Sequence, residues 1–212
     1  PSGTVEMRGC SFTFPWVACM VLHATGVMHS GAQQPPAAPP AVVSPATLNR
    51  VFGEAEAAFT AKDYNGAVAK IEELLKLLGP GKEAPYELLY FNIGLGHLLG
   101  GNYANAETAF KDCFKRYPKG EYASRCRLGI GRACMMQDAA EKKEEAITSL
   151  KAAALDPKYR SEAGLWLGEI LTDLGRHDEA LTVFKSLIGS DVRTPQQTTA
   201  AVEVVGLLAD SG

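Results

Sequence analysis

A short phrase recurs along the chain and constrains its fold more than any other feature. In the segments YNGAVAKI (64–71), YANAETAF (103–110) and HDEALTVF (177–184), a Tyr or His precedes an Ala by three places. A Phe or Ile follows that Ala by four places. Together with one further match, the recurring residues are Ala67, Ala106, Ala146 and Ala180, at spacings of 39, 40 and 34. Self-similarity at such a period indicates stacked supersecondary units.

Glycine recurs with a similar period, at Gly94, Gly129 and Gly168. A glycine inside a helix costs about 0.5–1 kcal/mol relative to alanine, so its repetition indicates a site that needs it. Two antiparallel helices that cross closely have such a site, because no side chain fits between them. We expect the alanine of the second helix to meet the glycine, and Phe110 or Phe184 to fill the gap one turn further on.

Each unit divides into two helical patterns of about 14 residues. The first helix of the second unit is expected over 85–100, with Pro85 in its first turn and Gly100 at its end. The second is expected over 103–117, followed by Pro118. Each helix pair buries only one face, so neighbouring pairs must stack to bury the other. The sequence therefore predicts an all-α solenoid of antiparallel helix pairs.

Residues 90–118, YFNIGLGHLLGGNYANAETAFKDCFKRYP, resemble a tetratricopeptide repeat. They share its small residue after Leu or Ile, its Gly before the turn, Ala-x-x-x-Phe and the closing Pro. Residues 164–184 resemble it nearly as well, whereas the first unit has Ala55 for the Gly and the third has Leu150 for the Phe and a short insertion. The resemblance implies a right-handed superhelix of about four units plus a lone helix, within a domain spanning 47–209. The expected units are 47–80, 87–120, 122–158, 161–194 and a partial 195–209. Their repeat-defining residues are Ala67, Gly94, Ala106, Phe110, Pro118, Gly129, Ala146, Gly168, Ala180 and Phe184.

The N-terminal stretch is of a different kind. Met7 and Arg8 precede an apolar run over 12–22, and small residues end at Ala32, as in a secretory signal peptide. The run is shorter than the roughly 20 apolar residues that span a bilayer. We expect residues 1–32 to be a signal, with Met7 as candidate start, and the chain to be exported to the periplasm or envelope. The alternatives are an uncleaved anchor, a buried helix, or a lipoprotein modified at Cys19.

Two further features bear on location and covalent links. The Pro- and Ala-rich residues 33–46 predict an extended linker. The junction FKRYPKGEYASRCRLG (114–129) is similar to exported bacterial repeats, among them the periplasmic Tol–Pal-associated coordinator and the β-barrel assembly lipoprotein. After the signal, three cysteines remain. Cys126 and Cys134, about 12 Å apart on one helix, cannot bridge each other, whereas a Cys113–Cys126 bridge stays open.

No catalytic or metal-binding pattern is present. The chain lacks HExxH, GxSxG, a phosphate-binding loop and a dinucleotide fingerprint, and its odd cysteine count with no CxxC does not favour zinc. We interpret His97 and His177 as packing residues. The net charge of −3 disfavours a nucleic-acid partner. We therefore expect no enzyme activity, no cofactor, no metal, no nucleic acid, and no transmembrane span once the signal is removed.

The resemblance implies that the first helix of each pair lines a concave groove for a partner peptide. Residues three before and one after each Gly point toward that groove at 100° per residue, and Asn92 and Arg127 match two places of the carboxylate clamp of co-chaperone repeats. Phe52 and Glu56 stand where the clamp's remaining residues would be, so a complete clamp is not expected. The alternatives are that the linker fills the groove or that these side chains pack between repeats. The predicted groove residues are Phe52, Phe91, Asn92, Leu95, Cys126, Arg127, Ile130, Leu165 and Glu169.

These expectations combine into a non-catalytic protein–protein interaction scaffold of the cell envelope. The alternative is a docking or spacer region of a larger exported enzyme or envelope-assembly protein. The helix over 195–209 is apolar nearly all round, so we expect self-association through it or marginal stability, unless further residues cap it. A basic excess over 111–127 would suit an acidic partner or an anionic membrane surface, or it marks a solvated turn.

Overall fold

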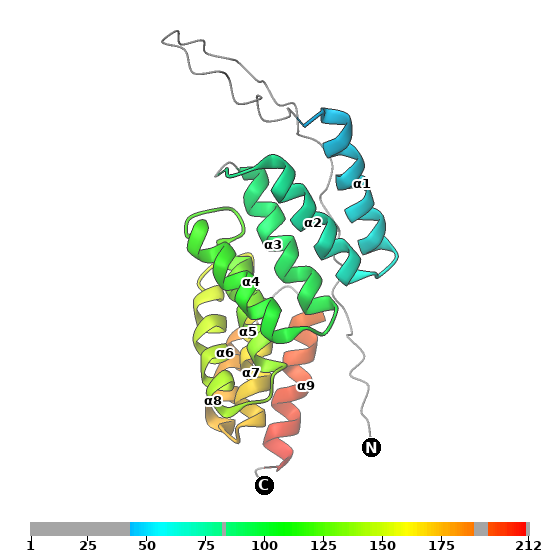
Figure 1. The fold of residues 1–212 in the computed structure, drawn as a ribbon. Coiled ribbons are helices and arrows are strands. Elements are labelled where there is room, and N and C mark those ends of the chain that lie inside the picture. The colour runs from blue at the N-terminus through cyan, green and yellow to red at the C-terminus, as the bar shows by residue number, and fades with distance from the viewer. Residues whose placement is uncertain (1–42, 82–83, 189–194, 211–212) are drawn as a thin grey trace, which may run out of the picture. The chain divides into compact units, whose positions relative to one another are not determined.

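The computed structural model describes residues 43–81, 84–188 and 195–210, and all regular structure within them is α-helical (Figure 1). The predicted all-α repeat solenoid is confirmed. The expected signal at 1–32, the linker as far as residue 42 and residues 189–194 lie outside the described residues. The helices are α1 (Pro45–Thr60), α2 (Tyr64–Leu78), α3 (Ala84–Leu99), α4 (Tyr103–Arg116), α5 (Ala123–Met135), α6 (Ala140–Ala153), α7 (Arg160–Asp173), α8 (His177–Leu187) and α9 (Pro195–Asp210).

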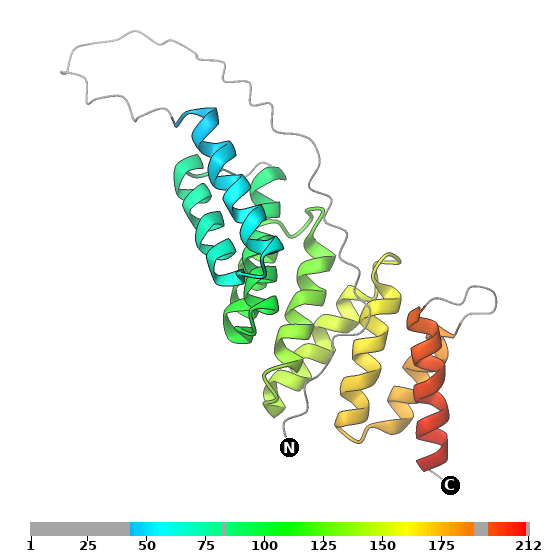
Figure 2. The same ribbon diagram turned by 90° about the vertical axis from the view of Figure 1, so that its right-hand side faces the viewer.

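Consecutive helices of residues 43–210 pack against each other in chain order, so the repeats stack as pairs. The odd-numbered helices α3, α5, α7 and α9 also contact one another in succession. We call them the inner row. Figure 2 shows the turns after α3, α5 and α7 on one side of the stack and those after α4 and α6 on the opposite side. The solenoid therefore has an inner row of helices and two edges made of turns.

The first helix begins two residues before the predicted start of the repeat domain. Ser44 is its N-cap, and the Ser44 hydroxyl accepts a hydrogen bond from the Thr47 amide at 3.1 Å. Pro45 follows as the first helical residue, where its missing N–H costs nothing. The linker predicted over 33–46 therefore extends too far, because a proline at this position starts a helix.

The turns inside the four helix pairs share one backbone conformation. In each, the residue two places before the second helix has a positive φ: Lys62 (60°), Gly101 (76°), Asp138 (53°) and Gly175 (70°). Glycine adopts this left-handed region without strain. The same turn thus recurs with and without glycine, which shows that packing of the pairs, and not only turn chemistry, imposes it.

Phe110 of α4 fills the space between two glycines on neighbouring inner-row helices. Its side chain is 1% exposed. A Cβ added to Gly94 of α3 would lie 2.5 Å from the Phe110 ring, and one added to Gly129 of α5 would lie 2.6 Å from it. The aromatic ring, and not Ala106 as expected from the sequence, therefore opposes the glycine. Ala106 is itself fully buried.

The third repeat uses a different register. Ala146 is the seventh residue of α6, whereas Ala67, Ala106 and Ala180 are each the fourth residue of their helices. Its insertion thus lengthens the start of α6. Leu150 consequently opposes Gly131, with 2.6 Å from its Cγ to an added Cβ. Gly129 is therefore not the counterpart of Gly94, as the sequence suggested, because it faces the preceding repeat.

A buried carboxylate joins the second repeat to the third. Glu87 of α3 is 4% exposed. Its Oε1 accepts the Tyr122 amide N–H at 2.8 Å, and its Oε2 accepts the Glu121 amide N–H at 3.2 Å. These amides immediately precede α5, whose first N–H groups lack intrahelical partners. Glu87 therefore caps the next repeat from inside the previous one.

Length and hydropathy bear on membrane insertion. Within residues 43–81, 84–188 and 195–210, the structure contains no helix of sufficient length and apolar character to cross a bilayer.

The contact between Gly94 and Phe110 makes a direct prediction. Gly94→Ala should lower the free energy of unfolding by about 1–3 kcal/mol, because the new methyl group overpacks the ring. Adding Phe110→Leu should cost less in this background than in the wild type, since the smaller side chain relieves the clash. Urea denaturation of the four proteins measures this coupling.

Gly53 of α1 provides the matched control. An added Cβ would meet nothing within 4 Å there, so Gly53→Ala should stabilise the chain by about 0.5–1 kcal/mol. Equal effects of the two Gly→Ala changes would contradict the proposed role of the aromatic ring.

Candidate functional site

Four of the predicted groove residues lie in the core. Phe91, Leu95, Cys126 and Ile130 are between 0% and 6% exposed. The Phe91 ring centroid lies 5.6 Å from that of Phe110 and 5.0 Å from that of Tyr122. These side chains pack between repeats and are core residues rather than groove residues, because closely stacked helices need apolar side chains on more than one face.

Cys126 shows the effect of the shifted register. Its thiol lies near that of Cys113 of α4, which donates a hydrogen bond to the Glu87 carbonyl oxygen at 3.6 Å. Interaction with the Cys113 thiol, together with burial, raises the pKa of the Cys126 thiol. Both are free thiols in this structure, and the bridge left open by the sequence remains a prediction.

The two polar anchors of the predicted groove engage different neighbours. Asn92 is 3% exposed, and its Nδ2 has no hydrogen-bond partner. It lies one helical turn before Gly96, where an added Cβ would be 2.6 Å from Val68 of α2. The guanidinium of Arg127 instead lies 4.6 Å from the centre of the Phe114 ring of α4. The structure therefore directs Asn92 to the α2 side and Arg127 to α4.

Half-buried side chains remain at Phe52 of α1 and on α7. On α7 they are Leu165, Trp166 and Glu169, which we call the α7 face. The sequence prediction included Leu165 and Glu169 but missed Trp166. The Arg132 guanidinium of α5 lies 4.9 Å from the centre of the Trp166 ring. An arginine within the apolar segment LGIGRAC was the sequence signal for this contact.

Glu169 has an unusual protonation equilibrium for a carboxyl group. Burial raises its pKa to about 7, and the negative charges of Glu203 and Asp173 add to the increase, while Arg132 opposes it. Near neutral pH the carboxyl group is therefore partly protonated and can donate as well as accept a hydrogen bond. Beside an indole ring, it offers a polar contact within an apolar surface.

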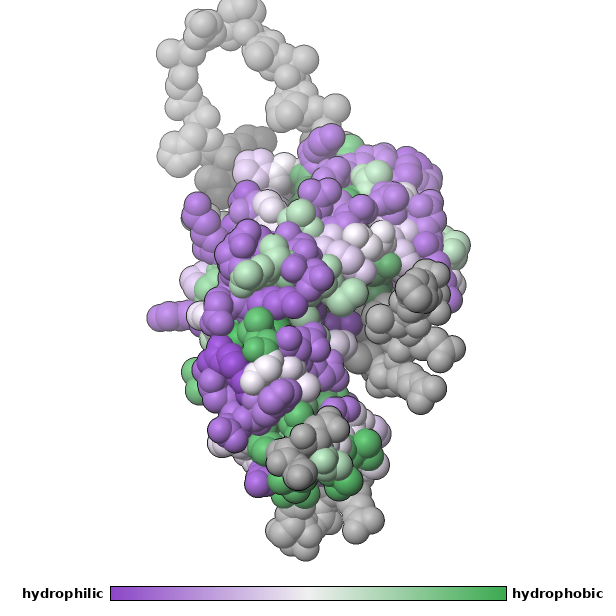
Figure 3. Space-filling model, turned by 90° about the horizontal axis from the view of Figure 1, so that it is seen from below, coloured by the Kyte–Doolittle hydropathy of each residue, from purple (hydrophilic) through white to green (hydrophobic). Residues whose placement is uncertain are grey.

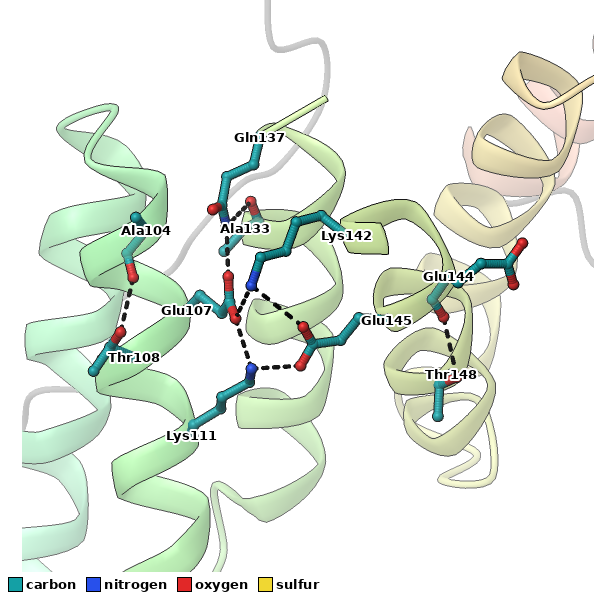
Figure 4. Close-up of polar contacts among 10 residues, drawn as sticks. All are labelled: Ala104, Glu107, Thr108, Lys111, Ala133, Gln137, Lys142, Glu144, Glu145 and Thr148. Atoms are coloured by element: carbon teal, nitrogen blue, oxygen red, sulfur yellow. Dashed lines mark hydrogen bonds and ion pairs between the residues drawn. The ribbon is translucent and has the colours of Figure 1, made fainter. Parts of the chain in front are cut away.

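A second polar cluster connects α4, α5 and α6 (Figure 4). Glu107 Oε1 accepts hydrogen bonds from the Nζ atoms of Lys111 and Lys142, each at 2.6 Å, and Oε2 accepts one from Gln137 Nε2 at 2.6 Å. Glu145 pairs with both lysines. Burial alone would raise the pKa of Glu107, but the bonds from Lys111, Lys142 and Gln137 hold it at about 2.

The Glu107 cluster has side chains spaced as in a metal site, but its carboxylates are paired with lysines as in a salt-bridge network. Candidate ligand atoms of Glu107, Cys134 and Glu145 lie within 4.8 Å of one another. However, Lys111 and Lys142 already neutralise the two carboxylates. Burial and the nearby Glu107 and Glu145 charges raise the pKa of Cys134 to about 12, whereas a metal-binding cysteine must lose its proton. The cluster therefore holds repeats together.

The C-terminal helix leaves an apolar surface uncovered. Val202, Val205 and Leu208 are 64%, 68% and 50% exposed, and an added Cβ at Gly206 would meet nothing within 4 Å. Figure 3 shows hydrophobic residues gathered toward one end of a face that is otherwise mostly hydrophilic.

The residues of α7 that correspond in the repeat to the exposed residues of α9 are covered by a neighbouring helix. They are Gly164, Leu167, Gly168 and Leu171, and all are buried. Leu187 and Phe184 of α8 oppose the two glycines, at 2.7 Å and 2.2 Å from an added Cβ. In α9 these four positions carry Val202, Val205, Gly206 and Ala209, and all are exposed. The α9 surface is therefore shaped for an antiparallel helix.

The low pKa of Glu107 predicts an acid-sensitive contribution to stability. The unfolded chain binds the proton near pH 4.5 and the folded chain near pH 2, so this stability is present above about pH 4.5 and is lost as the pH falls toward 2. Glu107→Gln should lower the free energy of unfolding by about 3 kcal/mol at neutral pH and should flatten the acid limb of the curve of stability against pH. Glu141→Gln, at an exposed position of α6, should change neither the stability at neutral pH nor its loss in acid. The same loss of stability in acid for both variants would contradict the role given to Glu107.

Comparisons with known proteins agree with this geometry. A family profile described as tetratricopeptide repeat matches residues 89–120 and 162–191. The structure of MamA protein is similar, with a TM-score of 0.61 and 17% identity, covering 78% of this chain and 82% of that one. A putative kinesin light chain from Podosopora anserina with TPR-like repeats has a TM-score of 0.62 and 13% identity, covering 78% and 88%. No curated protein sequence matches the chain significantly. Residues 89–120 and 162–191 therefore match tetratricopeptide repeats, and the helix pairs of the described chain share the fold of these repeat structures.

Proposed function

We propose that the chain is a non-catalytic scaffold that binds a partner peptide or helix on its inner row, with the α7 face as the principal contact. One comparison within the chain carries this proposal. On α3, the residues at the same offsets from the glycine are Phe91, Asn92 and Leu95, and all are buried. On α7, the equivalent Leu165, Trp166 and Glu169 are half-exposed. The α7 face is thus a partly apolar surface that the repeats themselves cover only in part.

The chemistry of the α7 face suits a peptide. A tryptophan supplies a large apolar contact at low conformational cost. The partly protonated Glu169 can pair with a backbone carbonyl or with an amide of an extended segment. The scaffold role agrees with the tetratricopeptide architecture, in which repeats generate extended binding surfaces.

Export is part of the same proposal. The charged, apolar and small-residue order of 7–32 supports cleavage after Ala32 and a place in the periplasm or envelope. N-terminal sequencing of the chain recovered from cells tests it. A recovered soluble cytoplasmic form that retains residues 7–32 would contradict it.

Site-specific photo-crosslinking tests the binding surface. A photoreactive phenylalanine derivative at Trp166 keeps an aromatic ring there and should form a covalent adduct with the partner in envelope extract. The same derivative at Ser186, exposed on α8, is the matched control and should give no adduct. Adducts from Ser186 alone, or equally from both positions, would reject the α7 face as the contact.

The exposed surface of α9 favours a second role, self-association. Val202, Val205, Gly206 and Ala209 form a seam with small residues, along which two antiparallel helices can approach closely. In a two-fold arrangement, Val202 meets Val205 of the second copy. A head-to-tail contact would place α9 of one copy against α1 and α2 of another. In the described chain, neither α1 nor α2 carries an exposed large apolar residue that α9 could cover. The proposed contact therefore closes as a dimer.

Sedimentation equilibrium over a range of concentrations tests this dimer. The wild-type chain should associate reversibly, and Val205→Glu should weaken association at least tenfold, because it places a charge in the seam. Thr182→Glu, at an exposed position on α8, should leave association unchanged. A monomer at every concentration, or equal effects of the two variants, would contradict the proposal.

A further inference from the structure

Two turns on the same edge of the solenoid carry a concentration of positive charge. They connect α4 to α5 and α6 to α7 and lie on the same side of the stack (Figure 2). The stretches 115–125 and 154–162 contain six cations and three carboxylates. The cations are Lys115, Arg116, Lys119, Arg125, Lys158 and Arg160, and all except the half-buried Arg125 are exposed.

Two of the three carboxylates are already engaged. An Asp156 oxygen accepts the backbone N–H of Lys158 at 3.0 Å, and Glu162 lies 4.0 Å from Arg132 of α5. Only Glu121 is an exposed acid in these stretches. In the described part of the chain, none of the six cations forms a salt bridge. The positive charge of this edge is therefore largely uncompensated, although the whole chain has a net charge of −3.

The opposite edge shows that this arrangement is not a general property of the repeats. There, Lys142 pairs with Glu107, Lys143 with Asp138 at 2.8 Å, and Arg176 with Glu144 and Glu179. Cations near the C-terminus of a helix are favoured by the helix dipole, which accounts for Lys115 and Arg116. It does not account for Lys119, Lys158 and Arg160, which lie in turns or at the start of α7.

An exposed apolar side chain stands among these charges. Leu155, in the turn after α6, is 77% exposed, the largest fraction among the exposed large hydrophobic residues of the described chain. Pro157 beside it is also exposed. We call Leu155, Lys115, Arg116, Lys119, Lys158 and Arg160 the junction patch.

We propose that the junction patch binds the surface of an anionic lipid bilayer, with its cations at the phosphate headgroups and Leu155 inserted at the acyl boundary. The tips of two neighbouring turns can touch one flat surface together. Lysine and arginine near such a surface gain from its negative potential, and arginine can bind a phosphate through two N–H groups. An acidic protein partner would satisfy the charges, but it would need a pocket for a leucine that protrudes from a turn. A bilayer accepts that side chain without one.

Co-flotation of the full chain with lipid vesicles tests the proposal. Vesicles of phosphatidylcholine with about one third phosphatidylglycerol should bind the chain more tightly than phosphatidylcholine alone, and binding should weaken as salt is raised. The apolar residues 12–22 could themselves bind lipid. The comparison of variants with the wild type therefore tests whether the junction patch binds the vesicles. Lys119→Glu and Lys158→Glu should each weaken binding at least fivefold, the effect of about one surface charge. Leu155→Ser should weaken binding while leaving the salt dependence unchanged.

Lys62→Glu is the matched control, since it makes the same charge change at an exposed position on the opposite edge. It should bind as the wild type does. Circular dichroism should show equal helix content in all variants, because every altered side chain is exposed. The proposal is overturned if Lys119→Glu and Lys158→Glu bind anionic vesicles like the wild type, or if Lys62→Glu weakens binding equally. Binding to soluble polyglutamate without binding to vesicles would also overturn it, in favour of an acidic polypeptide partner.

Discussion

The solenoid depends on large side chains that pack where inner-row helices have no side chain. The Phe110 ring lies against Gly94 and Gly129 and so determines how closely α3, α4 and α5 approach. Phe184 against Gly168 and Leu150 against Gly131 repeat this contact. Each glycine destabilises its helix by about 0.5–1 kcal/mol relative to alanine. In return, the helix makes extensive dispersion contact with a buried aromatic ring. With the helices this close, the Glu87 carboxylate reaches the amides that begin the next repeat.

Close packing also decides which residues remain for binding. Most apolar side chains of α3 and α5 are buried between repeats. The partly exposed apolar side chains of the inner row are therefore concentrated on α7. On α9, the residues that match the buried glycine positions of α7 are exposed in the described chain. The two proposed contact surfaces therefore lie at positions of the repeat pattern that other helices of the described chain leave at least half-exposed.

The two edges of the solenoid differ in whether their cations are paired with carboxylates. At the turns within the third and fourth pairs, Lys142, Lys143 and Arg176 are paired with carboxylates of the same or the preceding repeat. At the turns between pairs, cations of the junction patch have no such partners among the described residues. Salt bridges that connect repeats stiffen one edge, and the other edge keeps its positive charge available.

Local sequence patterns were sufficient to predict the helix pairs. The period of Ala67, Ala106, Ala146 and Ala180, together with the positions of proline and glycine, requires no tertiary information. The sequence also identified Phe110 and Gly94 as structural residues, and it predicted Leu165 and Glu169 as groove residues, which the structure leaves half-buried. Which residue opposes which glycine depended on tertiary packing, since Phe110 of α4 lies against Gly129 and Leu150 of α6 lies against Gly131. Tertiary packing likewise buried Phe91 and Leu95 and left Trp166 half-buried. Helical periodicity states which residues share a face, but only the packing of neighbouring helices determines whether that face is covered.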